Sequence, residues 1–345
     1  MFILRELRQR AKHATVPILF SFDSEFKTLE LEQNMLKSRK RADIARIESS
    51  FRTGSLRTAL KSAPQIERRA NLSPHVFDRE FRKKAKPVVI EGLMGHWPAL
   101  KKWSFDYLAA TCGSASVTVD SYDSQKAREM TFAEFVNMLK SSIPGEPLYL
   151  QEWLYMADCP FLAEDLPELL IAQYDFRRNL YGKSISTNHQ LWIGQAGGTT
   201  RFHQDSYFID VMHAQIVGEK HWSVMNPKAY VAFDKTGSFK FSNLIDDPAT
   251  QMMQCVLKPG DVIYLPALWW HRIELLTDSI GLGRKCLDKV NLQKHIHARF
   301  AELLSLALNH DAVKETYPEL YKVVVLRNQA WAKLMNIDLA RLRPS

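Results

Sequence analysis

Short apolar runs separated by glycine and proline fill the chain between about residues 148 and 286. Many short strands bounded by turn-forming residues are typical of a closed or sandwiched β fold such as a jelly roll. We therefore predict a mainly β fold with a double-stranded β-helix (jelly-roll) core and flanking helices. The runs that carry this prediction cover residues 148–150, 190–193, 213–217, 221–225 and 262–265.

Helical patterns flank the β-rich segment on both sides. Before it, Ser73 and Pro74 provide an N-cap and a first-turn proline for a helix over residues 75–84. After it, the segment 317–334 contains more apolar residues than one buried helical face requires. This excess indicates either homodimerisation or packing of the segment back on the β core. The predicted organisation is a basic helical N-terminal region at 1–71, a central β domain at 72–288 and a helical C-terminal tail at 289–345.

The positive charge of the chain is concentrated in its first quarter. Residues 1–86 contain 20 Lys and Arg against 10 Asp and Glu, whereas the remainder contains 26 against 28. Such a segment can contact nucleic acid, an acidic protein or an anionic membrane surface, although a solvated helical face is the simpler explanation of the charge. We therefore keep nucleic acid as one possible partner of this region.

Cysteine usage and hydropathy both favour an intracellular setting. The four cysteines are far apart and form no CxxC pair, which argues against a disulfide framework and against a zinc module. No apolar stretch is long enough to span a bilayer, and the short apolar run at 16–22 is not followed by a signal-peptide cleavage pattern. We expect a cytoplasmic protein without a membrane span, or a nuclear one in a eukaryote.

Two histidines and an aspartate form the candidate chemical centre. His203 and Asp205 are two residues apart, so on a strand they present an imidazole and a carboxylate on the same face. Downstream, Pro259-Gly260 makes a turn into an apolar strand that ends in His271. Two histidines and one carboxylate on one side of a metal, with the opposite positions open, form the ligand set of non-haem Fe(II) oxygenases. We predict that His203, Asp205 and His271 bind Fe(II) and are the catalytic centre.

A series of motifs in the same order resembles the Jumonji C oxygenases of the cupin superfamily, and within that family the asparaginyl hydroxylases that act on hypoxia-inducible factor. The resemblance runs from about residue 86 to 285, the whole presumed catalytic part of the central domain. The motifs are PVVI at 87–90, WPALKKW at 97–103, MTFAEF at 130–135, LYLQ at 148–151, the HxD, GEK at 218–220 and the segment from Pro259 to His271.

The resemblance implies a second small molecule, 2-oxoglutarate, as cosubstrate. Lys220 occupies the position of the lysine that pairs with its distal carboxylate, and Thr200 and Tyr149 occupy the positions of the hydroxyl partners. Gln151 resembles a glutamine that contacts the substrate.

Two departures from the family pattern stay open at this point. An asparagine that the hydroxylase has after the HxD is missing here, or its contact is supplied by Asp210. Arg284 follows His271 by 13 residues, a distance at which other 2-oxoglutarate oxygenases place an anchoring arginine, so Arg284 is a rival or a helper to Lys220.

These residues predict an Fe(II)- and 2-oxoglutarate-dependent dioxygenase that hydroxylates a C–H bond of a protein or peptide side chain and releases succinate and CO2. The alternatives are an oxygenase for a tRNA base or a small metabolite, a methyl-lysine demethylase and a non-catalytic cupin. The intact His-Asp-His set argues against the last.

Overall fold

The computed structural model describes most of the central domain. Residues 1–53 and 54–345 form two separate units, and of the first only Ser49 is described. Most of the predicted N-terminal region and C-terminal tail, including the candidate dimerisation segment, therefore lies outside the described residues. The described residues are 49, 54, 58, 60–121, 127–141, 147–169, 171, 189–205, 208–227 and 252–296.

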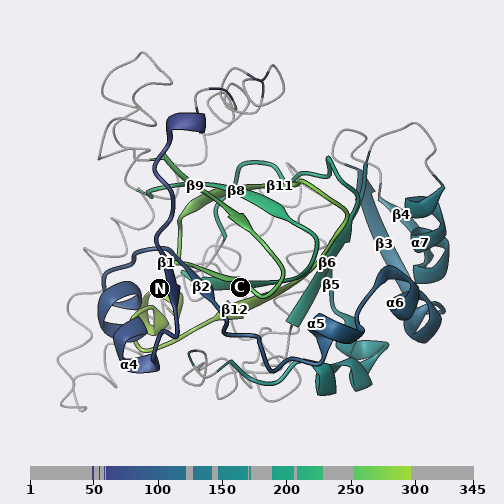
Figure 1. The fold of residues 1–345 in the computed structure, drawn as a ribbon, viewed down its shortest axis with the longest axis horizontal. Helices are drawn as coiled ribbons and strands as arrows, with labels where there is room; N and C mark the ends of the chain where they lie inside the picture. The colour runs from purple at the N-terminus through teal and green to yellow at the C-terminus, as the bar shows by residue number, and fades with distance from the viewer. Residues whose placement is uncertain are drawn as a thin grey trace, which may run out of the picture. The chain divides into compact units, whose positions relative to one another are not determined.

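Twelve strands among the described residues form two sheets that face each other around a closed core (Figure 1). The major sheet has the order β1-β2-β10-β7-β12-β6-β5-β3-β4, and the minor sheet has the order β11-β8-β9. The major strands are β1 (Arg68–Ala70), β2 (Val88–Glu91), β3 (Ser116–Ser121), β4 (Arg128–Thr131), β5 (Leu148–Trp153), β6 (His189–Gly194), β7 (Asp210–Val217), β10 (Val262–Leu265) and β12 (Ser279–Cys286); the minor strands are β8 (Lys220–Met225), β9 (Met252–Leu257) and β11 (Trp270–Leu275).

Side-chain alternation along the major sheet divides the interior into two cores. One core lies inside the barrel that the two sheets enclose, and the other lies outside it, on the outer face of the major sheet. On β10, Val262 and Tyr264 pack in the core outside the barrel, whereas Ile263 and Leu265 pack inside, against the minor sheet. Because successive side chains of a strand point to opposite faces, strands buried on both faces read as continuous apolar runs. The sequence of β10 is such a run, and the same alternation fixes which residues of β7 and β12 point into the barrel.

Short helices cover the outer face of the major sheet. Some of them follow a residue whose side chain caps the helix, and one such residue, Ser73, was predicted from the sequence. Ser73 caps α4 (Pro74–Phe77), which continues as a π-helical turn over Asp78–Arg82. The side chain of Thr131 and that of Glu134 form a reciprocal capping box at the start of α7. The remaining helices are α5 (Ala99–Lys102), α6 (Phe105–Cys112), α7 (Phe132–Lys140) and the 3₁₀ turns Leu60–Ser62, Tyr155–Ala157 and Pro160–Asp165.

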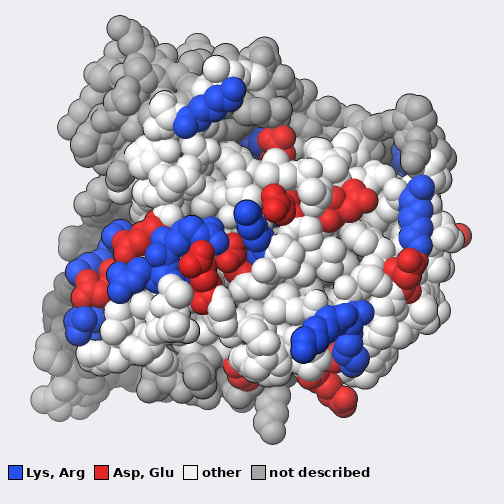
Figure 2. All heavy atoms as spheres, in the orientation of Figure 1, with Lys and Arg blue, Asp and Glu red and all other residues white. Residues whose placement is uncertain are grey.

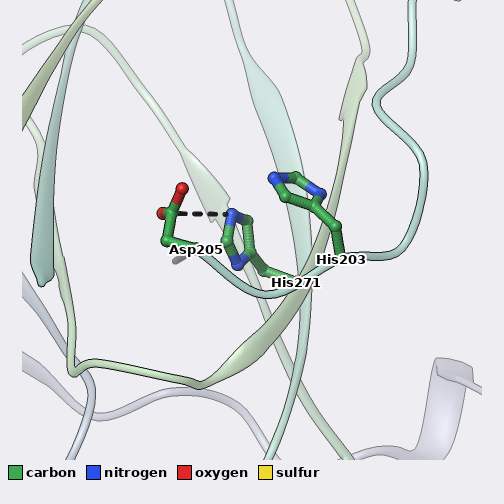
Figure 3. A group of neighbouring side chains, drawn as sticks. All are labelled: His203, Asp205 and His271. Atoms are coloured by element: carbon green, nitrogen blue, oxygen red, sulfur yellow. Dashed lines mark ion pairs between the residues drawn. The ribbon is translucent and has the colours of Figure 1, made fainter. Parts of the chain in front are cut away.

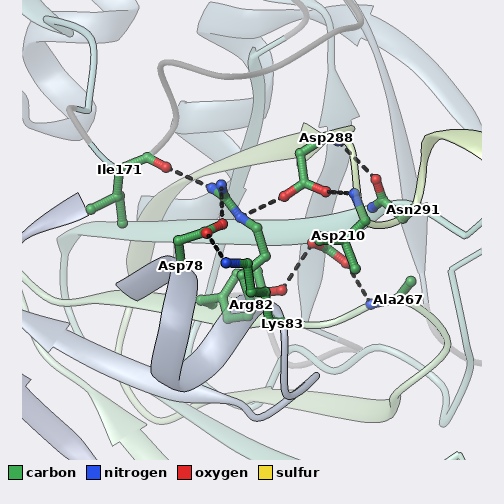
Figure 4. Close-up of polar contacts among 10 residues, drawn as sticks. Asp78, Arg82, Lys83, Ile171, Asp210, Ala267, Asp288 and Asn291 are labelled. Atoms are coloured by element: carbon green, nitrogen blue, oxygen red, sulfur yellow. Dashed lines mark hydrogen bonds and ion pairs between the residues drawn. The ribbon is translucent and has the colours of Figure 1, made fainter. Parts of the chain in front are cut away.

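A buried ion pair joins the helical layer to the chain that leaves β12 (Figure 4). Arg82 Nε lies 2.6 Å from Asp288 Oδ2, and both side chains are 6% exposed. The same guanidinium donates to the carbonyl oxygen of Ile171 at 2.8 Å and lies 3.5 Å from Asp78. The start and the end of the central domain are therefore held together by a fully paired charge.

The predicted mainly β fold with a jelly-roll core and flanking helices is confirmed. Each of the five predicted runs lies in a strand, and Ser73 and Pro74 start a helix as expected. All four cysteines are buried free thiols. Within the described part of the chain, no helix combines the length and the apolar character needed to cross a bilayer.

The Arg82–Asp288 pair gives a stability prediction. Arg82→Met should lower the free energy of unfolding by about 3–5 kcal/mol, because it leaves the Asp288 carboxylate buried without its counter-ion. Urea unfolding followed by circular dichroism measures the change. The matched control is Lys84→Met, which removes an exposed pair with Glu80 on the same segment and should leave the urea midpoint unchanged. Equal shifts for the two variants would contradict the prediction.

Candidate metal centre

His203 and His271 lie directly opposite each other on neighbouring antiparallel segments. The backbone N–H of His203 donates to the carbonyl of His271 at 3.0 Å, and that of His271 donates to the carbonyl of His203 at 2.8 Å. Two residues that exchange both hydrogen bonds project their side chains to the same side of a sheet. The two imidazole rings accordingly lie with their centroids 4.1 Å apart.

The backbone also fixes which ring nitrogen of each histidine is available. His203 Nδ1 lies 2.6 Å from the carbonyl oxygen of Arg201, and His271 Nδ1 lies 3.1 Å from that of Trp269. A carbonyl only accepts, so each Nδ1 carries the proton and each Nε2 keeps a lone pair. Burial, and then the neighbouring His203, lower the pKa of His271 to about 4, so its ring is neutral at pH 7. Neutral imidazole is the form that binds metals.

Asp205 completes the group. Its Oδ2 lies 3.8 Å from His271 Nε2, and the two face each other in Figure 3 with the ring of His203 beside them. The three ligand atoms lie within 4.8 Å of one another, so small side-chain movements would bring them within the about 4.4 Å that two ligand atoms at about 2.2 Å from one ion allow. Between the ligands, Gln204 Nε2 donates to the carbonyl of Leu268 at 2.6 Å and ties this segment to the loop before β11. The donor set fits Fe(II).

Lys220 is a fully buried basic residue whose side chain lies inside the barrel. Its side chain is fully buried, and its Nζ lies 3.3 Å from the carbonyl oxygen of Trp192 and 3.4 Å from His213 Nε2. Burial lowers the pKa of Lys220 to about 7. In the described part of the chain, no carboxylate contacts this ammonium group, so the pocket is set up for an anionic ligand.

The two predicted hydroxyl partners also point into the barrel. Tyr149 is 2% exposed, its hydroxyl has no hydrogen-bond partner among the described residues, and Lys220 Nζ lies 5.6 Å from the centre of its ring. Thr200 Oγ1 accepts from the Ile273 amide and keeps its own proton to donate. Burial raises the pKa of Tyr149, so its hydroxyl is a donor at every physiological pH.

A bulge explains how Thr200 and His203, three residues apart, share a face. Thr199 pairs with Glu274, and His203 pairs with His271. The two paired positions are therefore four residues apart on one segment and only three residues apart on the other. The extra residue reverses the alternation once.

Arg284 lies on the opposite face of the sheet from Lys220. It shares its face of β12 with Ile280 and Leu282, both in the outer core, and its guanidinium donates to Glu168 at 2.7 Å. The structure therefore brings Lys220, and not Arg284, into the barrel. Gln151 lies on β5, two residues after Tyr149, and is partly exposed.

Asp210 also lies outside the barrel. Its carboxylate accepts from the Tyr264 hydroxyl at 2.9 Å and from the Ala267 amide at 2.8 Å (Figure 4). Burial raises the pKa of Asp210 to about 6. Asp210 holds the loop that leads to His271 and is not available as a substitute for the missing asparagine.

The residue beside Lys220 that the sequence reasoning missed is His213. Its ring is buried, and Trp222 packs against both His213 and His271, with centroid distances of 5.3 and 5.9 Å. The sequence does carry a signal: His213 and Gln215 are polar residues at a spacing of two within the apolar strand β7.

Comparison with known proteins adds a family match and several relatives. The family described as Cupin-like domain matches residues 74–292, more than half of the chain. The arginine-specific demethylase JMJ22 of Arabidopsis thaliana is 29% identical over 251 residues, and the lysine-specific demethylase JMJ30 of the same plant is 30% identical over 243. These alignments cover 66% and 64% of this chain, but only 47% and 54% of the two relatives.

A shorter relative is covered more fully. The human bifunctional peptidase and (3S)-lysyl hydroxylase JMJD7 is 25% identical over 265 residues, which is 61% of this chain and 80% of that protein. The specific likeness to asparaginyl hydroxylases stays a prediction.

The triad gives a prediction about metal binding. His203→Ala and Asp205→Ala should each weaken Fe(II) or Mn(II) binding at least about 100-fold, because loss of a direct ligand exceeds the 10–100-fold effect of losing an outer partner. Anaerobic calorimetric titration measures the affinity. The control is His221→Ala, on the neighbouring strand β8, whose ring bonds to Gln254. Metal affinity that survives either ligand substitution would contradict the assignment.

Proposed function

Because the chain belongs to the Cupin-like domain family, we propose that it is an Fe(II)- and 2-oxoglutarate-dependent oxygenase that acts on a protein side chain. The observation that carries the proposal is that two groups of polar side chains lie inside the same β barrel. Two imidazoles and a carboxylate lie at one place, and a buried lysine that contacts no carboxylate of the described residues lies at another. The first group suits a divalent metal, and the second suits the far carboxylate of a dicarboxylic acid.

His203, Asp205 and His271 would hold the metal from one side. When bound there, Fe(II) and 2-oxoglutarate would activate dioxygen, the oxidant: one oxygen atom would enter succinate as CO2 is released, and the other would enter the substrate's C–H bond. The protein orients the reactants and excludes water. Phe202 and Trp270, each next in the chain to a proposed ligand, stack with their centroids 5.6 Å apart and are both nearly fully buried.

Lys220 is the proposed anchor for the distal carboxylate of 2-oxoglutarate. Tyr149 and Thr200 add hydroxyl donors, as a buried carboxylate needs more than one partner. Arg284 is not part of this anchor, because its side chain points to the outer core and pairs with Glu168.

A protein side chain is the substrate class we favour. The relatives carry names of lysine- and arginine-specific demethylases and of a lysyl hydroxylase, all reactions on protein side chains. Hydroxylation of a carbon and removal of an N-methyl group begin with the same C–H chemistry, so both outcomes fit this site. We place hydroxylation first, and the demethylases among the relatives make removal of a methyl group the second candidate.

The described charges favour a protein over nucleic acid as partner. Basic and acidic side chains gather together on the face shown in Figure 2. In the basic first quarter, Arg68 pairs with Glu91 at 2.7 Å and with Asp261 at 2.6 Å, and Lys86 pairs with Glu67 at 2.5 Å. These cations are therefore already compensated. We keep the proposal that the N-terminal region at 1–71 contributes to partner binding, and it concerns mainly the residues of this region that lie outside the described part of the chain.

The anchor assignment predicts different effects for two basic residues. Lys220→Met should weaken 2-oxoglutarate binding to the Mn(II)-loaded protein by about 2–5 kcal/mol, the scale for leaving a buried charge unpaired. Arg284→Met should change the affinity by less than about half a kcal/mol, because this side chain lies on the other face of the sheet, where it contacts Glu168 and shares no partner with Lys220. Calorimetry measures both. The reverse ranking would move the anchor to β12.

The reaction is tested by mass spectrometry. Cell lysate treated with active protein should contain peptides that gain one oxygen atom, and these should be absent with Asp205→Ala protein and in the absence of 2-oxoglutarate. Peptides that lose a methylene unit, with formaldehyde released, would select demethylation instead. Succinate formation without any change in a protein would contradict a protein substrate.

A further inference from the structure

Lys220 and His213 are two bases buried side by side, and no acidic side chain of the described residues contacts either of them. Both side chains are at most 2% exposed, and Lys220 Nζ lies 3.4 Å from His213 Nε2. A charged group in such a place is costly unless it has a counter-ion. The pair therefore holds few protons while the pocket contains no anion.

The barrel is built to bring these two bases together. A Cβ atom at Gly281 would lie 2.3 Å from His213 Nε2 and 2.9 Å from Lys220 Nζ, so any other residue there would displace both bases. Across β7, His213 faces Ile263 of β10 and Gly283 of β12, neither of which titrates. A glycine and an apolar residue lie opposite the buried imidazole, and its polar neighbours are Lys220 and the side chain of Gln215.

The other titratable groups around the pair do not supply a negative charge. Tyr149 of β5 keeps its proton, and His271 of β11, separated from His213 by Trp222, is neutral at pH 7. Both therefore leave the charge of the pocket to Lys220 and His213. Burial, and then Lys220, lower the pKa of His213 well below its ordinary value. His213 is thus a neutral acceptor for Lys220.

We propose that Lys220 and His213 form a proton-linked anchor: Lys220 takes up a proton from solvent when the cosubstrate's distal carboxylate enters, and His213 positions Lys220 by accepting its N–H. The proposal rests on the proposed function, because it needs 2-oxoglutarate in this pocket. It adds a positioning residue, His213, and a dependence of cosubstrate affinity on pH.

The sign of the pH dependence follows from the charges. With the pocket empty, the pKa of Lys220 is about 7, and a bound carboxylate restores it toward the ordinary value of about 10.4. Above pH 7, binding must bring a proton, so the affinity for 2-oxoglutarate should fall by up to about tenfold per pH unit. Below pH 7 the lysine is already charged, and the affinity should level off.

Calorimetry tests the linkage without relying on turnover. The Mn(II)-loaded full chain is titrated with 2-oxoglutarate in two buffers of different ionisation enthalpy, at pH 6 and at pH 8.5. We expect uptake of about one proton per ligand at pH 8.5 and almost none at pH 6, as a lysine with a pKa near 7 requires. The matched ligand is 2-oxopentanoate, which has the same carbon chain and 2-oxoacid end but no distal carboxylate, and it should show no such difference.

Two variants test the role of His213. His213→Phe keeps an aromatic ring but removes the acceptor, so the pH at which proton uptake begins should move down and the affinity at pH 7 should fall. His213→Gln offers an amide oxygen in place of Nε2 and should restore the wild-type profile. A merely structural role for His213 would change the affinity without moving the pH profile.

The possible outcomes distinguish failure of the proton-linked anchor from failure of the proposed oxygenase function on which it rests. If 2-oxoglutarate fails to bind the metal-loaded protein at any pH, the proposed function and the anchor both fail. Binding with the same heat in both buffers at pH 8.5 would overturn the proton linkage alone. A His213→Phe profile that superimposes on that of the wild type would overturn the positioning role of His213.

Discussion

Burial of the major sheet on both faces is the constraint on which the rest of the structure depends. Each of its central strands must supply apolar side chains in two directions, one set to the helices outside and one to the minor sheet inside. On β7, Met212 and Ala214 meet the outer requirement, which leaves His213 and Gln215 facing inward. The site is therefore built from the inward positions of strands whose outward positions hold the fold together.

Buried charged side chains have different surroundings on the outer and the inner face of the major sheet. Outside the barrel, Arg82 is paired with Asp288 and Arg284 with Glu168, so burial is compensated within the protein. Inside the barrel, Lys220 and His213 share one hydrogen-bonding contact and have no described acidic neighbour. Two bases together on one face of a fold that pairs its buried charges on the other face fit the proposed anchor, since an uncompensated buried charge otherwise only lowers stability.

The parts of the site that could be predicted from the sequence are those that depend on local spacing or on the family's motifs. The HxD and the segment that leads to His271 were sufficient to propose the metal ligands, because a spacing of two places both side chains of the HxD on one face. The expected single strand ending in His271 was wrong: β10 ends at Leu265, and His271 lies near the start of β11. Arg284 was placed by its distance from His271, and a count of residues carries no information about which face of a strand is used. The alternation of Ile280, Gly281 and Leu282 would have assigned that face if β12 had been recognised as a strand.

The bulge before His203 could not be predicted for a related reason. An extra residue between Thr199 and His203 leaves no mark in the sequence, because it is defined only by the partner segment that runs from Glu274 to His271. Without it, Thr200 and His203 would point to opposite faces, and the metal ligand would lose the hydroxyl that shares its side of the sheet. The pairing of two distant segments thus sets both the histidine pair and the position of the Thr200 hydroxyl. Backbone register, together with the packing of Trp222 against His213 and His271, links the proposed metal centre to the proposed cosubstrate pocket.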